Sequence, residues 1–225
     1  NNSFIKSEKE VKSVEKSYKY RIYPNEKQKE IIAKTFGCCR FVYNKYLAEK
    51  IELYKTEKKS ITYVKCAKAM AELKDELKWL TEVDSTALQS SLKDLDNAYK
   101  KFFKKLAKFP KFKSRKKSTP SFYQDSLNIQ FSKTHVKVEG FATSRKKNKQ
   151  KLNWIRLAER GRIPTDCKYS NPRIKFDGLN WWITVGIEYP DSIVVPENEG
   201  VGIDLGIKDL AICSDGNKYK NINKS

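Results

Sequence analysis

Apolar positions recur at helical spacing through most of the first half of the chain. From about residue 25 to residue 109 they return every three or four residues, as in successive amphipathic helices. The strongest pattern follows Asp84, a residue type that favours helix N-caps. Its apolar stripe consists of Leu88, Leu92, Leu95, Tyr99, Phe102 and Leu106. A polar stripe at the same spacing consists of Gln89, Lys93, Asn97, Lys100 and Lys104, which is either a solvated face or a ligand-binding one.

Two local signals concern the first helix of this region. Asn25 and Gln28 stand three residues apart, the spacing of a capping box, so we expect a helix to begin there. Gly37 interrupts the apolar pattern, and glycine is unfavourable inside helices. We therefore expect a break or kink at Gly37, with a second helix after it.

Alternation at every second residue brackets the helical region. Residues 17–24 predict a strand that Pro24 ends, and period two returns in residues 127–131, 135–138, 173–176 and 181–188. Several short strands of this kind suggest a small barrel, and the strand at 17–24 is a natural additional member. We therefore predict an α+β fold in which a small β-barrel is interrupted by an inserted helical region.

The last two of these strands predict a hairpin. Asp177-Gly178 lies between them, and an Asp-Gly pair is a strong signal for a tight turn. Trp181 and Trp182 point to opposite faces of the second strand, so we expect one in the core and the other on a contact surface.

Residues 201–212 form two apolar runs around Gly206, closed by Ser214-Asp215-Gly216. This pattern predicts a buried strand, a tight turn that contains Asp209, and an antiparallel return strand. Asp204 lies inside the first run, where a carboxylate is costly to bury unless it is paired or binds a metal. A hydrogen-bonded structural role and a role in catalysis both fit Asp204 on these residues alone.

The charge balance points to a polyanionic partner. Lysine and arginine number 47 against 27 acidic residues, giving a net charge of +20. Each phosphate that such side chains neutralise releases condensed counterions. Aromatic residues make up 12% of the chain and lie among the basic ones, which favours nucleic acid over a membrane because rings stack on bases. No stretch approaches 18 apolar residues, so we expect no membrane association.

The densest basic region lies around Pro110 and Pro120, which predict a loop or extended arm. Its lysines are interleaved with Phe109 and Phe112, so we favour tracking of phosphates over a solubilising linker. A second basic run occupies residues 144–149. The candidate contacts to a nucleic-acid backbone are Lys100, Lys104, Lys111, Lys113, Arg115, Lys116, Lys117, Arg145, Lys146 and Lys147.

Cysteine and histidine usage excludes several kinds of chemistry. The five cysteines are scattered and form no C-x-x-C pair, so we expect reduced thiols, no disulfide framework and no zinc site. His135 is the single histidine, so no cluster of several histidines can form, and we do not expect Ser/His/Asp or Cys/His catalysis.

Taken together, these blocks resemble the TnpB family of transposon-encoded RNA-guided nucleases. The similarity lies in residues 18–25, 36–44, 87–89, 95–99, 102–103, 109–117 and 178–188, and in Gly202-Ile203-Asp204-Leu205-Gly206. The resemblance implies a wedge β-barrel interrupted by a helical recognition domain and followed by the first strands of a ribonuclease-H-like RuvC domain. The implied boundaries are a flexible extension at 1–16, a wedge strand at 17–24, the recognition domain at 25–109, a basic loop at 110–120, the wedge at 121–196 and RuvC from 197 to 225.

The resemblance also implies partners and roles. A guide RNA, comprising a scaffold and a guide segment, pairs with double-stranded target DNA while the protein reads a short flanking motif. Gln89, Ser85 and Lys93 match the positions that read this motif, with Tyr123 and Gln124 as weaker matches. Asp204 matches the first RuvC carboxylate, which holds Mg²⁺ together with further carboxylates. We expect a cytoplasmic, nucleoid-associated protein of bacterial or archaeal type, with a monomer favoured.

The chain departs from the family in one respect. The second and third carboxylates and the zinc ribbon of the family have no counterpart in residues 1–225, so no cleavage is expected from these residues alone. Three hypotheses stay open: the chain is part of an RNA-guided endonuclease, it is a nuclease-dead repressor derived from TnpB, or it is a general basic RNA-binding protein. The Asp204 motif by itself also resembles the first phosphate motif of actin-like ATPases.

Overall fold

The computed structural model describes residues 13–138, 153–165, 167–190 and 200–222. The chain divides into a larger unit of residues 12–189 and a smaller unit whose described residues are 190 and 200–222. Each unit is described by itself. None of the helices in the described ranges is long and apolar enough to cross a membrane.

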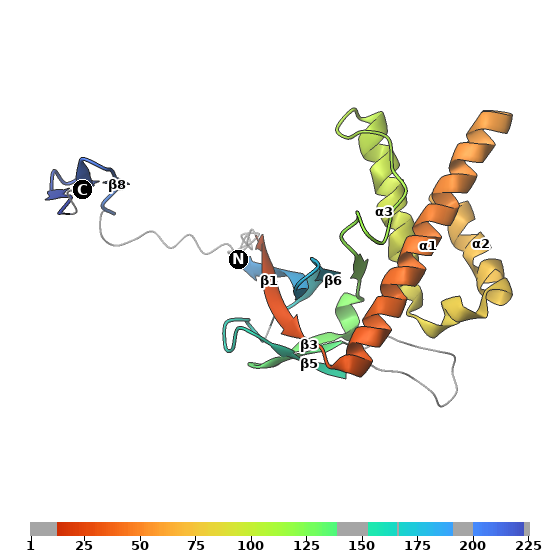
Figure 1. Ribbon diagram of the computed structural model, residues 1–225, viewed down its shortest axis with the longest axis horizontal. Coiled ribbons are helices and arrows are strands. Elements are labelled where there is room, and N and C mark those ends of the chain that lie inside the picture. The colour runs from red at the N-terminus through yellow and green to blue at the C-terminus, as the bar shows by residue number, and fades with distance from the viewer. Residues whose placement is uncertain (1–12, 139–152, 166, 191–199, 223–225) are drawn as a thin grey trace, which may run out of the picture. The chain divides into compact units, whose positions relative to one another are not determined.

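The helices of the larger unit follow one another between its first two strands (Figure 1). They are α1 (Glu26–Glu57), α2 (Tyr63–Glu76), the short 3-10 helix η1 (Lys78–Glu82) and α3 (Ser85–Phe103). The apolar faces of α1, α2 and α3 contribute buried residues to one shared core. The helical insertion predicted from the sequence is therefore present, but α3 ends at Phe103, so Leu106 is exposed rather than part of its stripe.

The predicted capping box begins α1. The Asn25 side chain accepts a hydrogen bond from the Gln28 backbone N–H, and the Gln28 side chain accepts one from the Asn25 N–H, each at 2.9 Å. The Gln28 amide also donates to the Trp154 carbonyl at 3.0 Å. The same side chain therefore starts the helix and fixes its first turn to strand β5 (Asn153–Leu157).

The prediction that Gly37 breaks the first helix is wrong, because α1 runs without interruption through it. A glycine inside a helix costs about 1 kcal/mol relative to alanine. Its neighbours Phe36, Cys38 and Cys39 are all buried, and burial of several apolar side chains outweighs that cost. Tertiary packing thus overrides the local preference of Gly37.

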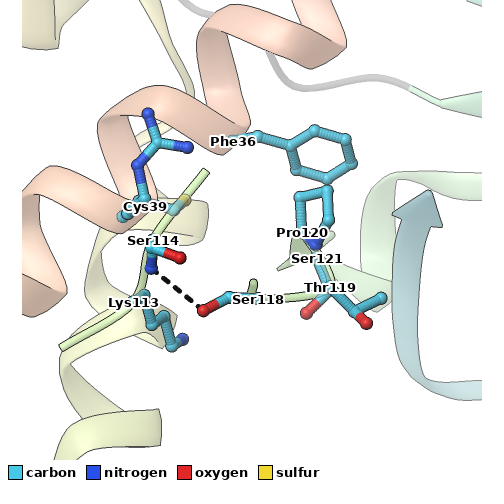
Figure 2. Close-up of a pocket in the computed structure, with 9 residues that line it drawn as sticks. Phe36, Cys39, Lys113, Ser114, Ser118, Thr119, Pro120 and Ser121 are labelled. Carbon is cyan, nitrogen blue, oxygen red and sulfur yellow. Dashed lines mark hydrogen bonds between the residues drawn. The ribbon is translucent and has the colours of Figure 1, made fainter. Parts of the chain in front are cut away.

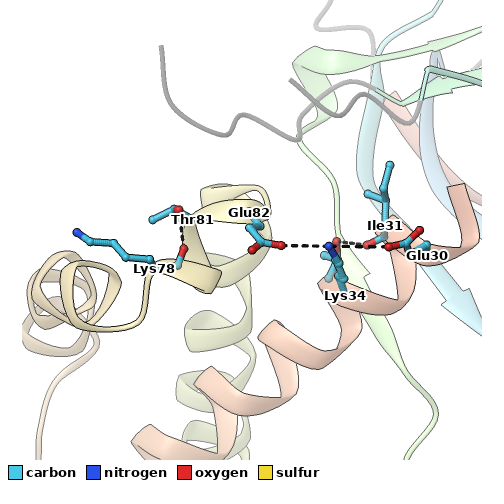
Figure 3. A network of polar contacts seen from close by, with 7 residues as sticks. Glu30, Ile31, Lys34, Lys78, Thr81 and Glu82 are labelled. Carbon is cyan, nitrogen blue, oxygen red and sulfur yellow. Dashed lines mark hydrogen bonds and ion pairs between the residues drawn. The ribbon is translucent and has the colours of Figure 1, made fainter. Parts of the chain in front are cut away.

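A polar network joins α1 to η1 beside Gly37 (Figure 3). The Lys34 ammonium lies 3.1 Å from the Glu82 carboxylate and 3.9 Å from that of Glu30. The hydrogen bond to Glu82 raises the pKa of Lys34. These side chains are well exposed, so the network adds little to stability and mainly orients η1 against the helix.

The strands of the larger unit form one seven-stranded sheet with the order β2-β6-β7-β1-β5-β4-β3. Besides β5, they are β1 (Ser13–Tyr23), β2 (Ser121–Tyr123), β3 (Ile129–Phe131), β4 (His135–Val138), β6 (Tyr169–Phe176) and β7 (Trp181–Pro190). As predicted, the N-terminal strand joins the later ones, and it lies between β7 and β5.

Three details of the sheet differ from expectation. The strand β1 begins at Ser13, so residues 13–16 belong to the sheet rather than to a flexible extension. Within the described residues the strand order has two free ends, at β2 and β3, so the sheet is open rather than a closed barrel. Both end strands have three residues, which leaves little edge for closure by pairing.

The third difference is at the start of β3, where a 3-10 turn, η2 (Ser126–Asn128), replaces the first residues of the predicted strand. The Asp125 carboxylate accepts a hydrogen bond from the Leu127 N–H at 3.1 Å and caps this turn. Leu127 is 89% exposed as a result. Strand β5, which pairs with β4, was not predicted from the sequence.

The helices meet the sheet through an aromatic cluster. The Phe36 ring of α1 stacks on Trp181 of β7 with centroids 6.0 Å apart, and it meets Phe122 of β2 edge-on at 5.5 Å. Trp182 lies on the opposite face, where the Lys19 ammonium is 4.1 Å from its ring centroid. Trp181 therefore packs against the core as predicted, whereas both indoles are half-buried and the contact role of Trp182 stays a prediction.

The hairpin predicted between β6 and β7 is also confirmed. The Asp177 carboxylate accepts hydrogen bonds from the N–H groups of Asn180 at 2.7 Å and Leu179 at 2.9 Å, and from the Trp182 indole at 2.6 Å. These bonds, led by the one from Asn180, lower the pKa of Asp177 to about 2. Gly178 follows with φ of 105°, a conformation that side chains with a Cβ rarely adopt.

The smaller unit is a three-stranded antiparallel sheet with β9 (Asp209–Cys213) between β8 (Ile203–Leu205) and β10 (Lys218–Lys220). The predicted strand–turn–strand is therefore present. Two details of that prediction are wrong. Asp209 begins β9 instead of lying in the turn, and β8 is exposed rather than buried, with Leu205 at 74%.

Replacing Gly37 with alanine tests the uninterrupted helix. A Cβ at this position would meet no atom within 4 Å, so the variant should be more stable by about 0.5–1 kcal/mol, the helix-interior difference between the two residues. Urea unfolding followed by circular dichroism measures this. Gly178→Ala is the matched control and should lose roughly 1–3 kcal/mol through its positive φ. A loss of stability in Gly37→Ala would contradict a continuous, unstrained α1 at this position.

Candidate nucleic-acid interface

An open polar pocket of about 300 Å³ lies where α3 meets β2 and β6. It brings together three of the residues predicted to read a DNA motif, Gln89, Lys93 and Tyr123. The other residues that line it are Thr86, Ser90, Asp94, Asn97, Asp125, Asn171 and Arg173. Amides, a guanidinium, an ammonium, a phenol and two carboxylates thus converge on one surface.

The helix α3 presents Gln89, Lys93 and Asn97 as an exposed stripe, because residues four apart lie on one face. The opposite face is buried in the core through Leu88, Leu92 and Leu95. As predicted, Asp84 caps the helix by accepting a hydrogen bond from the Thr86 N–H at 3.1 Å. Burial raises the pKa of Asp84.

The strand β6 contributes to the pocket through a bulge. Its register with β7 shifts between Ser170 and Arg173, and Asn171 adopts a positive φ of 45°. Pro172, which has no N–H to donate, accepts a hydrogen bond from the Gln124 N–H at 2.9 Å. Bulges commonly turn a side chain toward a functional surface. The proline within a strand was the available signal for this site, since it marks bulges and edges.

One bidentate ion pair crosses from α3 to the sheet inside this pocket. The Arg173 guanidinium donates to both oxygens of the Asp94 carboxylate, at 3.0 and 2.6 Å. Their side chains are 27% and 29% exposed, so the pair is partly shielded from water. Parallel hydrogen bonds of this kind fix orientation as well as distance. Periodicity in the sequence gives no sign of the pair, because its members lie 79 positions apart.

The other two residues predicted to read DNA lie elsewhere. The Ser85 hydroxyl accepts a hydrogen bond from the Lys74 ammonium at 2.7 Å and does not line the pocket. Gln124 is completely buried, with 0% of its surface exposed. The observed structure therefore does not present Gln124 to a DNA base.

The basic segment after α3 contains neither helix nor strand until Ser121, in agreement with the predicted loop. It is anchored at Lys113, whose backbone N–H and carbonyl make hydrogen bonds of 2.8 Å with the Asn44 side chain of α1. The Lys113 ammonium lies 4.1 Å from the Tyr43 ring centroid, and burial lowers its pKa. Lys113 was predicted to contact phosphates, but the structure turns it inward because the Asn44 contacts hold its backbone against α1.

The residues after Lys113 form a turn closed by hydroxyl groups (Figure 2). The Ser114 N–H donates to the Ser118 hydroxyl at 3.0 Å, as Figure 2 shows. The Lys117 N–H donates to the Ser114 hydroxyl at 2.9 Å. This turn leaves Arg115, Lys116 and Lys117 exposed. Beneath it is a small hollow lined by Phe36, Cys39, Arg40, Lys113, Ser114, Ser118, Thr119, Pro120 and Ser121.

The remaining predicted backbone contacts have mixed positions. Lys104 and Lys111 are exposed, whereas the Lys100 ammonium is 2.8 Å from the Asp96 carboxylate. Arg145, Lys146 and Lys147 lie outside the described residues. Of the predicted contacts that the structure describes, Lys104, Lys111, Arg115, Lys116 and Lys117 are exposed and follow α3, whereas Lys100 is exposed within α3 and paired with Asp96.

Asp204, the predicted catalytic carboxylate, is exposed on β8, opposite Ile212 of β9. Across the described ranges no group of three or more His, Cys, Asp or Glu side chains could hold a metal ion. A single exposed carboxylate does not fit a two-metal magnesium centre, which needs several carboxylates around both ions. No catalytic step can be assigned to these residues.

All five cysteines are free thiols. Cys38, Cys39 and Cys66 are buried in the larger unit, and Cys167 and Cys213 are partly buried. Burial raises the pKa of Cys38 to about 11, so this thiol stays protonated near neutral pH.

Comparison with known proteins gives several similarities. A family described as a helix-turn-helix domain, HTH_OrfB_IS605, matches residues 14–59, which in this chain form most of β1 and all of α1. A "Putative RNA-guided DNA endonuclease" of Streptomyces pristinaespiralis is 32% identical over 94% of this chain and 51% of its own length. The protein InsQ of Escherichia coli K12, with the same description, is 31% identical over 92% of this chain and 49% of its own.

Two further similarities are more limited. The virulence protein VsdF of Salmonella dublin is 35% identical over 42% of this chain and 88% of its own length. Among solved structures, a Cas12f1–sgRNA–target DNA complex aligns with a TM-score of 0.44 and 11% identity, over 94% of this chain and 66% of that one.

The family match and the two endonuclease relatives place the chain among proteins that carry an OrfB-type helix-turn-helix domain. Within that class it belongs to the TnpB family, as the sequence blocks implied. The chain spans about half the length of these two endonuclease relatives.

A double-mutant cycle tests the ion pair between α3 and β6. Asp94→Ala and Arg173→Ala should each destabilise the fold, and the double variant should lose less than their sum, with a coupling energy of about 1–2 kcal/mol. Urea unfolding of all four proteins measures it. The Asp96–Lys100 pair within α3, whose lysine is 68% exposed and which makes a single contact, is the control, with an expected coupling of about 0.3–0.5 kcal/mol. Equal couplings for both pairs would show that Asp94–Arg173 has no special role.

Limited trypsin digestion tests the anchor of the basic segment. Asn44→Ala removes two hydrogen bonds to Lys113, a loss of about 1–3 kcal/mol, so cleavage after Arg115, Lys116 and Lys117 should be roughly tenfold faster. Mass spectrometry of the fragments gives the rate at each site. Asn97→Ala, an exposed asparagine on α3, should cleave like the parent protein. Unchanged cleavage in Asn44→Ala would refute the anchor.

Proposed function

We propose that this chain is the nucleic-acid-binding portion of an RNA-guided DNA endonuclease of the TnpB type. It would bind a guide RNA and a target DNA next to a short flanking motif. The observation that carries this proposal is the polar pocket between α3, β2 and β6, in which Gln89, Lys93 and Tyr123 come together on an exposed surface. The names of the full-length relatives agree with it.

The chemistry of the pocket suits a DNA edge. An exposed glutamine on a helix can make two hydrogen bonds with the major-groove edge of adenine, and α3 is long enough to enter that groove. Lys93, one turn further along, can neutralise an adjacent phosphate. The carboxylate of Asp94 does not oppose the DNA charge on its own, because Arg173 neutralises it.

The guide RNA is the polyanion that we assign to the exposed cations after α3. Lys111, Arg115, Lys116 and Lys117 project from a segment whose backbone is anchored to α1, and they carry charge without base-reading geometry. Such contacts make affinity strongly dependent on salt. The net charge of +20 favours binding of a polyanion such as RNA.

DNA cleavage is proposed only for a polypeptide that supplies more than residues 1–225. Asp204 would then be the first of several carboxylates that hold Mg²⁺, and the bound ion would supply activation of a water nucleophile. We also propose that the seven-stranded sheet is the wedge domain and that the smaller unit is the beginning of the RuvC-like domain.

Binding of duplex DNA with varied flanking sequence tests the reading of a motif by Gln89. Protein loaded with a guide RNA is titrated with targets that share the paired region and differ only in the flank. For Gln89→Ala, the ratio of affinities between the best and the worst flanking sequence should fall roughly tenfold. This corresponds to the loss of one bidentate contact, which contributes about 1–3 kcal/mol of discrimination. Gln130→Ala, an exposed glutamine on β3, is the matched control and should keep the preference.

Two further outcomes separate the competing functions. Lys93→Gln should weaken all flanks alike and reduce the salt dependence by about one phosphate contact. If the parent protein shows no flank preference and tolerates any RNA, it is a general RNA-binding protein and the proposal fails. If Gln89→Ala keeps the preference for the flanking sequence, residues other than Gln89 recognise the motif.

A further inference from the structure

A second pocket, distinct from the polar one, opens between the last turns of α1 and the end of α3. Its volume is about 450 Å³, and most of its lining is carbon. The residues around it are Lys50, Ile51, Tyr54, Lys55, Lys58, Ser60, Tyr99, Phe102, Phe103 and Phe109. None of these residues lines the polar pocket between α3, β2 and β6 or the hollow beneath the turn after Lys113.

Four rings form one wall of this pocket. Phe109 meets Tyr99 and Phe102 edge-on, with centroids 5.6 and 5.3 Å apart, and Phe103 lies 5.3 Å from Phe102. The edge-on packing holds Phe109 against α3 although it belongs to the loop. Phe103 is 74% exposed, so one face of the cluster remains open to a ligand. An exposed cluster of this kind indicates a binding surface rather than core.

Lysines supply the rim. Lys55 and Lys58 are exposed, and the Lys58 ammonium lies 5.5 Å from the Tyr54 ring centroid. Lys50 is buried, 5.2 Å from the Tyr99 ring centroid, and donates a hydrogen bond to the Ile61 carbonyl, so it belongs to the wall rather than to the rim. No carboxylate is among the residues that line the pocket. Aromatic rings flanked only by cations are the combination that single-stranded nucleic acids require, for stacking and for phosphates.

We propose that this pocket binds unpaired nucleotides of the RNA, with one base stacked on Phe103. The inference rests on the proposed function, in which the chain binds a guide RNA. A second copy of the chain suits the pocket less well, because two lysine-rimmed faces of a +20 protein would repel each other. A duplex suits it less well too, because its bases already stack on one another.

Two substitutions at one position separate stacking from simple apolar contact. Phe103→Leu keeps an apolar side chain and removes the ring, whereas Phe103→Tyr keeps the ring. The probe is a short single-stranded RNA, titrated by fluorescence anisotropy into the chain of residues 1–225. Phe103→Leu should bind it roughly tenfold more weakly, equivalent to about 1.4 kcal/mol, and Phe103→Tyr should bind like the parent. Because Phe103 is largely exposed, neither change should unfold the protein.

Crosslinking locates the base. RNA that carries 5-iodouridine is irradiated in the complex, and the modified peptide should contain Phe103, Phe109 or Tyr54. Leu127→Ala is the matched control, since Leu127 is exposed, apolar and distant in sequence from the pocket. It should change neither affinity nor crosslinking. The same oligonucleotide as DNA shows whether the pocket prefers RNA, and equal or tighter binding of DNA would overturn the assignment to RNA.

The remaining outcomes each decide one point. Parent-like affinity of Phe103→Leu for the single strand, or crosslinks elsewhere, would overturn the proposal. A concentration-dependent dimer that Phe103→Leu abolishes would assign the pocket to a second copy instead. Failure of the proposed function would appear separately, as a parent protein without flank preference that still loses RNA affinity in Phe103→Leu.

Discussion

The ion pair between Asp94 and Arg173 is the constraint that connects the helical insertion to the sheet where the candidate interface lies. An amphipathic helix can rotate or slide on an apolar surface with modest loss, because dispersion contacts are not directional. A bidentate pair is directional, and partial burial makes its loss costly. The polar stripe of α3 therefore faces β2 and the bulge of β6 in one fixed register, which is the geometry that a base-reading surface needs.

Much of the fold could be predicted from periodicity. The capping box at Asn25, the α3 stripe after Asp84 and the hairpin at Asp177 depend on residues within a few positions of one another, so the local pattern sufficed. The uninterrupted α1 through Gly37 could not be predicted in this way, because packing from distant segments compensates the glycine. Likewise, strand β5 and the open ends of the sheet depend on pairings that the local pattern does not encode.

The candidate site shows the same division. Gln89 and Lys93 were accessible to sequence reasoning because they share a helical face, and Tyr123 followed from family resemblance. Arg173 and Asn171 were not, since a bulge in a distant strand brings them into the pocket. Lys113 was misassigned because charge alone does not reveal that Asn44 holds its backbone. In the smaller unit, the apolar run at β8 predicted a strand correctly but not its burial, which depends on what packs against it.

The contact between Asn44 and Lys113 also changes the polymer physics of the basic segment. A single long loop explores a large volume, and binding a ligand then costs the conformational entropy of ordering all of it. An anchor near its middle divides it into two shorter tethers with pinned ends. Each tether samples less space, so the guanidinium and ammonium groups of Arg115, Lys116 and Lys117 have a high effective concentration near α1 before any ligand arrives.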